Sequence, residues 1–589
     1  MSGLSGATSS KAAAPRQIDV AARRRTVLLL SLITAAAAAV RFYGLDWGAP
    51  YYHFHIDEHF VFLGALAIRQ DFLAAADSPK FFMYSPLPMY ALIGMTEAYE
   101  RLGHPLNLAL KNDGIIFMVL GRSISATLGT ATIPLVYAIA AQVSGRAAGL
   151  VAATLAAAGV LHLRDSHFFS VDVSLTFFSV LAWLFMVRIV RRGTIGSYLA
   201  TGVATGAALA CKYSAAFLLP ITLVAHLCAP DRPLRTAPWR EWIRWLVRGT
   251  IPGVIAGLTF LLLDPYVWLD FDKFVAGVRE LVTGPMSGEV VAIWGAQFTD
   301  VQPRMFWFTN ILWWGLGPAF EIWALLGIAW LVWRRDRMAV IVAAFPVIYY
   351  IVAGRTILPF ARYAVPLVPS LAVVAGVFSA DLFRQRPPWR RVGLLATSLV
   401  VVSTVLYAAA YMNVFIKPDS RLTASDYLRR RVPEGATVLV EPSHNTPPMG
   451  AYLANPNFDE DYVLWGQESE RHDYYHLISL DTYRFLYDRR PSPQEKREYI
   501  ERRLAMADYI VMDDTYLQFY AHLPDKEHGV VKQYYEDLFA GRLGFRLLRS
   551  FKVYPRLGGI DINDDAAELT FRLFDHPRVF VFVRDAPRG

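Results

Sequence analysis

Long apolar runs dominate residues 26–413 and are absent from residues 1–25 and 414–589. Most of them approach the roughly 17–25 residues that an α-helix needs to cross a bilayer. The eleven runs are 26–43, 114–142, 147–162, 172–190, 196–211, 213–229, 247–263, 309–333, 338–353, 359–381 and 392–413. The pattern predicts an α-helical polytopic membrane protein of about eleven transmembrane helices, preceded by a basic tail and followed by a separate domain.

The run 86–102 decides the topology. It contains Glu97, Glu100 and Arg101, so we interpret it as an interfacial helix rather than a span. The arginine-rich connections then fall on the same side as the basic N-terminus, which the positive-inside rule makes cytoplasmic. Those connections carry Arg146; Arg188, Arg191 and Arg192; Arg232, Arg235, Arg240, Arg244 and Arg248; Arg334, Arg335 and Arg337; and Arg384, Arg386, Arg390 and Arg391. The loop 44–113 and the segment 414–589 are therefore expected outside the cytoplasm.

The first apolar run follows Arg23, Arg24 and Arg25. We interpret it as an uncleaved signal anchor, with a cleaved signal peptide as the alternative. The overall composition, 54% hydrophobic with a mean hydropathy of +0.31, is too apolar for a soluble chain of 589 residues. The net charge of +8 comes mostly from arginines in the short connections, which argues against a nucleic-acid partner.

Residues 414–589 have the composition of a soluble α/β domain. Helical segments are predicted at 423–431 and 498–507, and strands at 437–441 and 508–512. Two further β-prone runs, 568–574 and 578–584, flank a turn signal at Asp575-His576-Pro577.

The first outer loop holds two adjacent carboxylates, Asp57 and Glu58, among several histidines. One carboxylate can act as a general base on an acceptor hydroxyl. Alternatively, His55, Asp57 and His59 can bind a divalent cation, or the acids can simply favour a helix N-terminus. No cofactor is firmly predicted.

Further charges lie at the ends of spans on the same side. Asp172 stands at the mouth of one span, where it serves either as the helix cap or in a cavity. Lys212 lies between two apolar halves with no acid nearby in the sequence, and Arg122, Arg355 and Arg362 recur in similar positions. Such cations either snorkel to the interface or meet an anion, for which a lipid-linked phosphate is suited.

The order of these motifs resembles the GT-C superfamily, in particular the bacterial relatives of the dolichyl-phosphate-mannose protein mannosyltransferases (glycosyltransferase family 39). The resemblance covers roughly residues 26–415. The motifs are Arg41-Phe42-Tyr43-Gly44-Leu45-Asp46, Asp57-Glu58, Tyr84-Ser85-Pro86-Leu87-Pro88, Gly121-Arg122-Ser123, His167 to Asp172, Lys212-Tyr213 and Arg362-Tyr363-Ala364-Val365-Pro366. The chain departs from some relatives at Met83-Tyr84, where they carry an acidic and a basic residue.

The resemblance implies an inverting transfer of a sugar from a polyprenyl-phosphate donor to an acceptor hydroxyl or amine. It makes Asp57 the base or acceptor-orienting acid, accompanied by Glu58. Asp172 matches the second acidic position. Lys212 with Tyr213, and also Arg122 and Arg362, would bind the donor phosphate.

Since many such relatives are thought to work without metal, the divalent-cation reading becomes the weaker alternative. The resemblance also implies a multi-pass protein of the bacterial inner membrane whose site and C-terminal domain face the periplasm.

Three other functions fit the same topology: a transporter or flippase of lipid-linked saccharides, an inactive GT-C-like scaffold, and an oligosaccharide ligase with a diphosphate donor. A transporter predicts charges at mid-span and inverted repeats, which the sequence lacks. The acceptor can be a protein, a lipid or a glycan.

Overall fold

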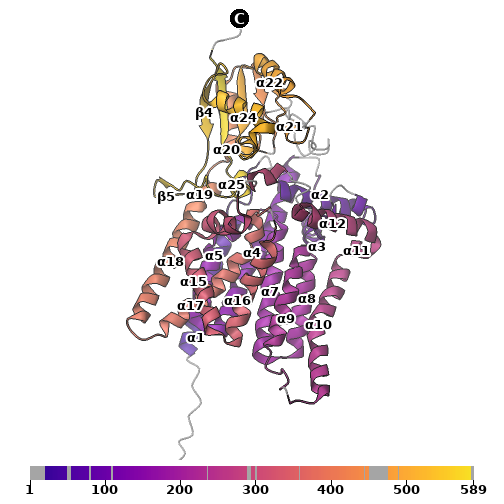
Figure 1. Cartoon of the computed structure of the whole chain (residues 1–589), viewed down its shortest axis with the longest axis vertical. Helices are drawn as coiled ribbons and strands as arrows, with labels where there is room; N and C mark the ends of the chain where they lie inside the picture. Colours follow the sequence, from indigo (N-terminus) through magenta and orange to yellow (C-terminus); the bar gives the residue numbers. More distant parts are fainter. Residues whose placement is uncertain are drawn as a thin grey trace, which may run out of the picture.

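The computed structural model consists of a helical bundle with a smaller domain on one end (Figure 1). It describes residues 20–49, 55–77, 81–107, 111–234, 236–287, 293–298, 301–356, 358–443, 445–449, 475–488 and 490–585. We call the end of the bundle that carries the smaller domain the domain face.

Every predicted span forms a helix. The bundle helices are α1 (Val20–Phe42), α4 (Lys111–Ser144), α5 (Arg146–Ala158), α7 (Val171–Arg192), α8 (Ile195–Leu209), α9 (Leu218–Leu227), α10 (Trp239–Leu263), α15 (Pro318–Arg334), α16 (Arg337–Ala353), α17 (Leu367–Phe383) and α18 (Trp389–Tyr411). Within the described residues, six helices are long and apolar enough to cross a membrane, or seven if a pair bent by 120° at Gly317 is one span. The other predicted spans are apolar helices of 10–17 residues, so fewer than eleven pass on length alone. The prediction of a helical polytopic membrane protein is confirmed.

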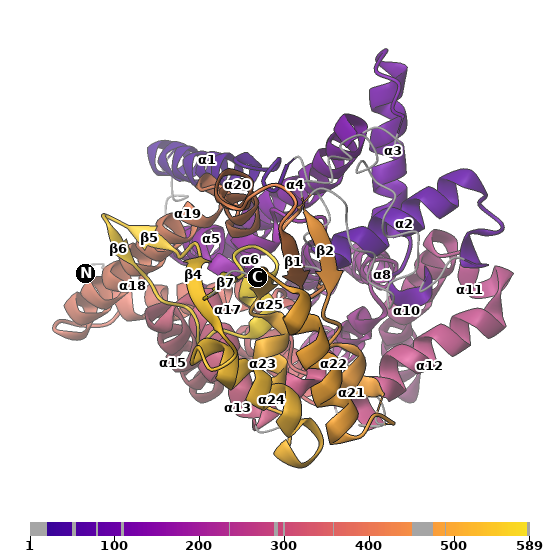
Figure 2. The same cartoon turned by 90° about the horizontal axis from the view of Figure 1, so that it is seen from above.

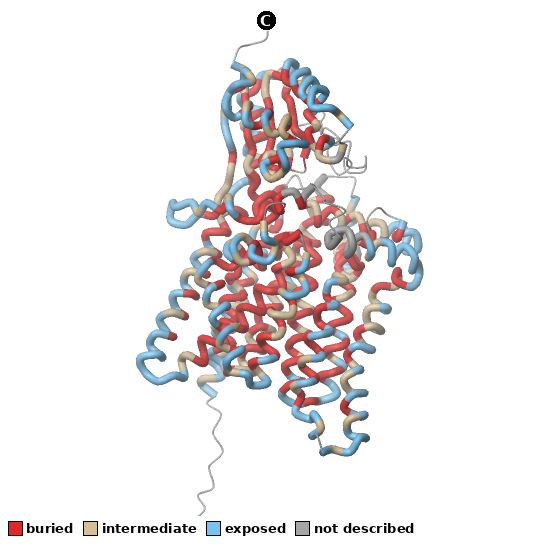
Figure 3. The backbone as a smooth tube through the Cα atoms, viewed as in Figure 1, coloured by how far each residue is buried: buried red, intermediate tan, exposed pale blue. Residues whose placement is uncertain are grey.

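Among the described long apolar helices, the one that contains α17 has the most buried apolar window, 89%, and residues 367–381 are all buried. Figure 3 shows buried residues throughout the inside of the bundle. A helix that is apolar on every side belongs in such a core. Small residues bring α17 close to α5: a Cβ on Gly376 would lie 2.4 Å from the Ala148 carbonyl oxygen and 2.8 Å from the Ala152 Cβ. Close backbone approach at small residues is how membrane helices pack. By contrast, only 11% of the apolar window is buried in α1 and in α10, so their surfaces suit lipid.

Short helices cover the domain face. They are α2 (Ile56–Gln70), η1 (Ala75–Asp77), η2 (Phe81–Met83), α3 (Leu87–Arg101), α6 (Val160–Asp165), η3 (Tyr213–Phe217), α11 (Tyr266–Leu269), α12 (Phe271–Ser287), η4 (Ile293–Phe298), α13 (Pro303–Phe306), η5 (Trp307–Leu312), α14 (Trp313–Leu316), η6 (Ala361–Ala364) and α19 (Asn413–Ile416). Helix α3 covers the ambiguous run 86–102; it is not among the helices with the length and hydropathy of a span, and it projects from the edge of the bundle (Figure 2).

The C-terminal domain is built on a five-stranded sheet of order β2-β1-β3-β7-β4. Its strands are β1 (Thr437–Val440), β2 (His476–Ser479), β3 (Tyr509–Asp513), β4 (Phe545–Phe551) and β7 (Val579–Arg584). β1 pairs in parallel with β2 and β3, with Leu439 opposite both Ile478 and Ile510, whereas β7 is antiparallel to β3 and β4. The apolar strands explain why the sheet is buried between helices.

The helices of this domain are α20 (Ser420–Arg431), α21 (Arg484–Tyr487), α22 (Pro493–Met506), α23 (Thr515–Ala521), α24 (Asp525–Phe539) and α25 (Leu569–Leu573). A hairpin of β5 (Arg556–Leu557) and β6 (Ile560–Asp561) turns through Gly558 and Gly559, which both have positive φ. The predicted α/β domain is confirmed.

One element of the domain was predicted wrongly. The β-prone run 568–574 is the helix α25, because the Glu568 side chain accepts hydrogen bonds from the backbone N–H groups of Thr570 and Phe571 and so caps a helix. The second β-prone run does form a strand, β7.

Candidate functional site

Asp57 lies in the first turn of α2 and is held from two sides. Its Oδ1 accepts a hydrogen bond of 2.7 Å from the Tyr84 hydroxyl, and its Oδ2 pairs with the Arg362 guanidinium of η6. Tyr84 precedes α3, and Arg362 is 305 positions away in sequence. Three distant segments therefore meet at one carboxylate on the domain face.

Asp57 is ionised in this arrangement. Burial opposes its charge, but the Arg362 guanidinium, His55 and the Tyr84 hydrogen bond outweigh burial and hold its pKa well below the usual range. Burial and the Asp57 charge raise the pKa of Tyr84, so its hydroxyl stays a donor. Asp57 is thus a weak proton acceptor for as long as Arg362 stays paired with it.

A second acid–cation pair lies alongside. The Lys212 ammonium is 2.8 Å from Oδ1 and 3.1 Å from Oδ2 of Asp172. Lys212 stands in the break between α8 and α9, and Asp172 lies in the first turn of α7. Of the two readings of Asp172, the helix cap is wrong: Ser170 is the cap, and its hydroxyl accepts from the Asp172 N–H at 3.2 Å.

The two pairs meet on the ring of Tyr363. The Lys212 Nζ lies 5.0 Å and the Arg362 Cζ 5.5 Å from the ring centroid, both within cation–π range. The Tyr349 hydroxyl of α16 donates to the Tyr363 carbonyl oxygen and fixes this residue. The structure therefore brings together Asp57, Asp172, Lys212 and Arg362, as the sequence suggested for one face.

Glu58 and Arg122 form a separate, fully buried pair. Both guanidinium–carboxylate contacts are 2.9 Å, and the Phe169 N–H donates to Glu58 at 2.7 Å. The remaining Arg122 nitrogen donates to the carbonyl oxygens of Leu45 and Trp47. Because every polar group of the pair is satisfied inside the protein, it ties α2 to α4 and has no group turned toward a ligand.

Tyr213 points away from the two pairs. Its hydroxyl lies 3.4 Å from Oδ2 of Asp264, the residue that ends α10. Burial raises the pKa of Asp264 to about 7. Sequence reasoning missed Asp264, although an acid directly after a span was a visible signal.

His55 of the first outer loop packs against aromatic rings. The His55 ring packs between the rings of Phe168 and Phe574, with centroids 4.6 and 4.5 Å away, and burial lowers its pKa to about 4. In the described part of the chain no three His, Cys, Asp or Glu side chains are placed to hold a metal ion. The alternative site of His55, Asp57 and His59 is therefore not formed.

The C-terminal domain reaches into the domain face beside the site. Arg164 of α6 bonds to Asp575 Oδ2 at 3.0 Å, to Asp165 at 2.9 Å and to the Thr570 carbonyl oxygen. Asp575 also accepts from the Tyr411 hydroxyl at 2.8 Å, and its Oδ1 lies 2.7 Å from His576. This ion-pair network was not predicted, although Asp575 and His576 belong to a turn that the sequence had singled out.

Two electrostatic effects follow from the network. Burial opposes the Asp575 charge, but Arg164 and His576 lower its pKa to about 2. Burial raises the pKa of Asp165 to about 7; Arg164 counteracts this, while the charges of Asp172, Asp575 and Asp57 add to it. The Asp165 carboxyl is therefore protonated more easily than an ordinary aspartate.

Glu568 links the same domain to η6. Its carboxylate accepts from the Ala361 N–H at 3.2 Å, directly before Arg362, and from the Gln297 amide at 2.8 Å. The Gln297 oxygen in turn accepts from the Leu569 N–H at 3.1 Å. The backbone of η6 is therefore held from the bundle by Tyr349 and from the C-terminal domain by Glu568.

The fold and these contacts define a multi-pass membrane protein with a charged site between its helix ends and an attached α/β domain. Residues 116–262 match the family model described as dolichyl-phosphate-mannose-protein mannosyltransferase. This match, which covers α4 to α10, agrees with the resemblance drawn from the motifs. No curated protein sequence matches the chain.

Several solved membrane proteins are similar in chain path. The oligosaccharyltransferase AglB of Archaeoglobus fulgidus, solved with an inhibitory peptide and a dolichol-phosphate, is 11% identical over 92% of this chain and 75% of its own, with a TM-score of 0.48. ArnT of Cupriavidus metallidurans in the apo state is 15% identical over 85% of this chain and 95% of its own, with a TM-score of 0.46. The Pmt1-Pmt2 protein O-mannosyltransferase of S. cerevisiae is 18% identical over 42% of this chain and 34% of its own, with a TM-score of 0.33.

Proposed function

We propose that the protein is a glycosyltransferase that moves a sugar from a polyprenyl-phosphate donor to an acceptor hydroxyl or amine, with inversion at the anomeric carbon. The observation that carries the proposal is the pair of acid–cation contacts on Tyr363, Asp57 with Arg362 and Asp172 with Lys212. The match of residues 116–262 to a mannosyltransferase family supports it. By the positive-inside rule the domain face would be periplasmic in a bacterial inner membrane.

The proposed reaction needs both the cations, Lys212 and Arg362, and the Asp57 carboxylate. The acceptor oxygen or nitrogen attacks the anomeric carbon, the bond from that carbon to the phosphate oxygen breaks, and the phosphate diester leaves as a monoester. The leaving group gains one negative charge, which Lys212 and Arg362 would stabilise, a contribution often among the largest in enzymes. The acceptor proton passes to Asp57, and general-base help of this kind contributes about 10²–10⁴-fold.

Donor binding would also change the basicity of Asp57. Arg362 now holds the Asp57 pKa low, which makes the carboxylate a poor base. A phosphate that draws Arg362 toward itself would remove the strongest cause of this lowering. Asp57 would then orient the acceptor first and take its proton late in the step. Asp172 would hold the Lys212 ammonium in place until the phosphate arrives.

Glu58 and Arg122 receive a positioning role in this proposal. Their ion pair fixes the first turn of α2, where Asp57 lies, against α4 and against the backbone at Phe169. Tyr213 and Asp264 lie beside the site and touch neither acid–cation pair in the contacts of the structure.

The experiment begins with the lipid that co-purifies with the full chain in mild detergent, identified by mass spectrometry. A polyprenyl-phosphate sugar is the expected donor, and release of free polyprenyl phosphate in nanodiscs then measures turnover. A diphosphate-linked saccharide would overturn the proposal in favour of a ligase. Movement of the intact lipid-linked sugar between leaflets, with no release of the carrier, would indicate a transporter.

Two variants test the assigned roles. Asp57→Asn keeps the Tyr84 hydrogen bond but cannot accept a proton, and Lys212→Ala removes the cation; each should abolish turnover. The exposed residues Glu97 and Lys273 supply matched controls, Glu97→Gln and Lys273→Ala, which should turn over like the wild type. Wild-type turnover in Asp57→Asn would remove Asp57 from the base role.

A further inference from the structure

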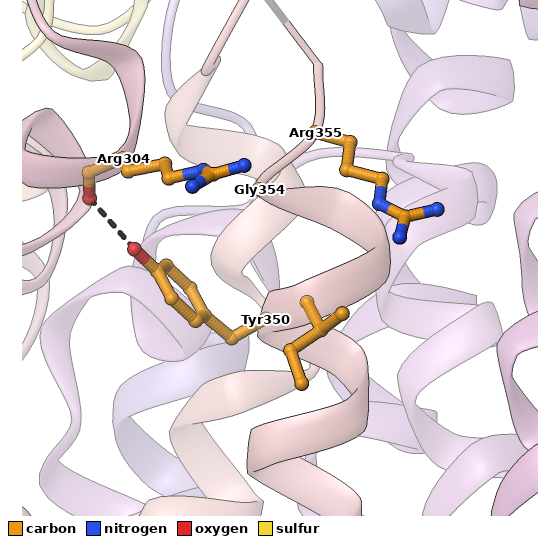
Figure 4. Close-up of a pocket in the computed structure, with 5 residues that line it drawn as sticks. Arg304, Tyr350, Gly354 and Arg355 are labelled. Carbon is orange, nitrogen blue, oxygen red and sulfur yellow. Dashed lines mark hydrogen bonds between the residues drawn. The ribbon is translucent and has the colours of Figure 1, made fainter.

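A second cationic site lies beside the first, on the lipid side of α16. Arg304, Tyr350, Ile351, Gly354 and Arg355 line a cavity of about 220 Å³ (Figure 4). Arg304 comes from α13, and Arg355 follows the end of α16. Figure 4 shows the Arg304 side chain extended above Tyr350 toward the chain at Gly354 and Arg355, and the Arg355 side chain directed away from Arg304.

The walls of this cavity are fixed. The Tyr350 hydroxyl donates to the Arg304 carbonyl oxygen at 3.0 Å, which joins α16 to α13. The Tyr350 ring packs against Phe308 at 5.1 Å and Trp307 at 6.0 Å. The Arg304 backbone is therefore held against the end of α16, and Arg355 lies two residues beyond that end.

Among the described residues, neither guanidinium is paired with a carboxylate. In the part of the chain that the structure describes, no carboxylate lies within ion-pair distance of Arg304 or Arg355, whereas Arg362, seven positions further on, is paired with Asp57. Two cationic side chains that line one cavity without an acid repel each other. An anion between them would remove this repulsion, and a phosphate group matches the planar donor pattern of guanidinium groups.

The surroundings indicate where that anion comes from. Met305, Ile351 and Val352 are each about half exposed, and they flank the cavity on the surface of a helix end that faces lipid. A phosphate that reaches the cavity along these side chains would carry an apolar tail. Arginines that merely snorkel need not line a common cavity, whereas Arg304 and Arg355 line the same one.

We propose that Arg304 and Arg355 bind the phosphate group of a lipid headgroup at the domain face. Its position has a consequence for the first site. Tyr349, the neighbour of Tyr350 on α16, donates to the Tyr363 carbonyl oxygen, so consecutive residues of one helix contact the two sites. A lipid phosphate held here would therefore be linked through α16 to the site of Lys212 and Arg362. Binding itself does not depend on the proposed glycosyl transfer.

The test uses the full chain in nanodiscs of neutral lipid doped with a photoactivatable phosphatidylglycerol. Crosslinks are mapped by mass spectrometry to the peptides that contain residues 304 and 355. The double variant Arg304→Gln and Arg355→Gln should lower this crosslinking at least about tenfold, the effect of losing one charge-assisted contact of about 1.4 kcal/mol. Arg390→Gln with Arg391→Gln, two exposed arginines in the first turn of α18, is the matched control and should leave it unchanged.

Three results would overturn the proposal. Unchanged crosslinking in the double variant would mean that the arginines hold no phosphate. Equal crosslinking by a photoactivatable diacylglycerol, which lacks phosphate, would reduce the site to an apolar contact. Complete competition by millimolar inorganic phosphate would make it a site for the free anion rather than for a lipid headgroup. Circular dichroism and gel filtration of the double variant confirm that it has folded.

Discussion

The contact between Arg164 and Asp575 gives the sharpest test of how the C-terminal domain is attached. Asp575→Asn keeps the size of the side chain and removes its charge. The replaced oxygen accepts from Arg164 at 3.0 Å and from Tyr411 at 2.8 Å, and the other oxygen lies 2.7 Å from His576. All three partners are buried, so no water can take the place of the lost charge.

The size of the effect follows from burial. Removing one partner of a buried ion pair costs about 3–5 kcal/mol, because the other charge is left without compensation. Arg164 keeps Asp165 at 2.9 Å, so we expect the lower end, about 3 kcal/mol. That energy corresponds to an increase of roughly 100-fold in the population with the contact open.

Hydrogen exchange with mass spectrometry measures this opening. Amides of α25 and of residues 574–577 should exchange about 100-fold faster in Asp575→Asn. Asp585→Asn, which breaks an exposed pair of 3.7 Å with Arg546, serves as the control and should change exchange by less than about threefold. In the double variant with Arg164→Gln the cost should be smaller than the sum of the two single variants. Exchange at wild-type rates in Asp575→Asn would refute the reasoning.

Three further outcomes are expected. Arg122→Gln should lower the free energy of unfolding by about 3–5 kcal/mol in denaturant titrations, since Glu58 would be left buried and unpaired. Wild-type stability combined with weaker donor binding would instead indicate that Arg122 binds the donor phosphate. Burial raises the pKa of Glu441 to about 8 from 4.5, so the folded state retains a proton that the unfolded state releases, and stability falls as pH rises between these values. Glu441→Gln should therefore raise the thermal midpoint above pH 8 and leave it unchanged below pH 4.5, and equal midpoints at all pH values would contradict this. Lys417→Cys should react with an impermeant maleimide in intact cells and Arg386→Cys only after permeabilisation; the reverse pattern would invert the topology.

Most of the fold could be predicted because hydrophobic periodicity is a local property. The apolar runs became helices, and the strands β1 and β3 formed where β-branched and aliphatic residues cluster. The run 568–574 has the same β-prone composition and became α25, because Glu568 caps it and the bundle buries it. Tertiary contacts decided that segment, and its sequence alone carried no signal of them.

The site residues could be found from the sequence, but their pairing could not. Asp57, Asp172, Lys212 and Arg362 were conspicuous because charges at the ends of apolar spans are costly without a partner. Arg122 met the same criterion, but in the structure it forms an ion pair with Glu58. The distinction depends on contacts between residues 64 to 305 positions apart, which no local pattern records.

In the proposed transfer Arg362 exchanges Asp57 for the donor phosphate, and the arrangement of η6 would suit it to do so. The backbone on either side of it is fixed, by the Glu568 carboxylate at the Ala361 N–H and by the Tyr349 hydroxyl at the Tyr363 carbonyl oxygen. Only the side chain then has to move, so exchanging the Asp57 carboxylate for a phosphate requires rotation about side-chain bonds and no rearrangement of the helix ends. Since one of the two anchors belongs to the C-terminal domain, loosening that domain should disturb Arg362 before it disturbs Lys212, whose partner Asp172 belongs to the bundle.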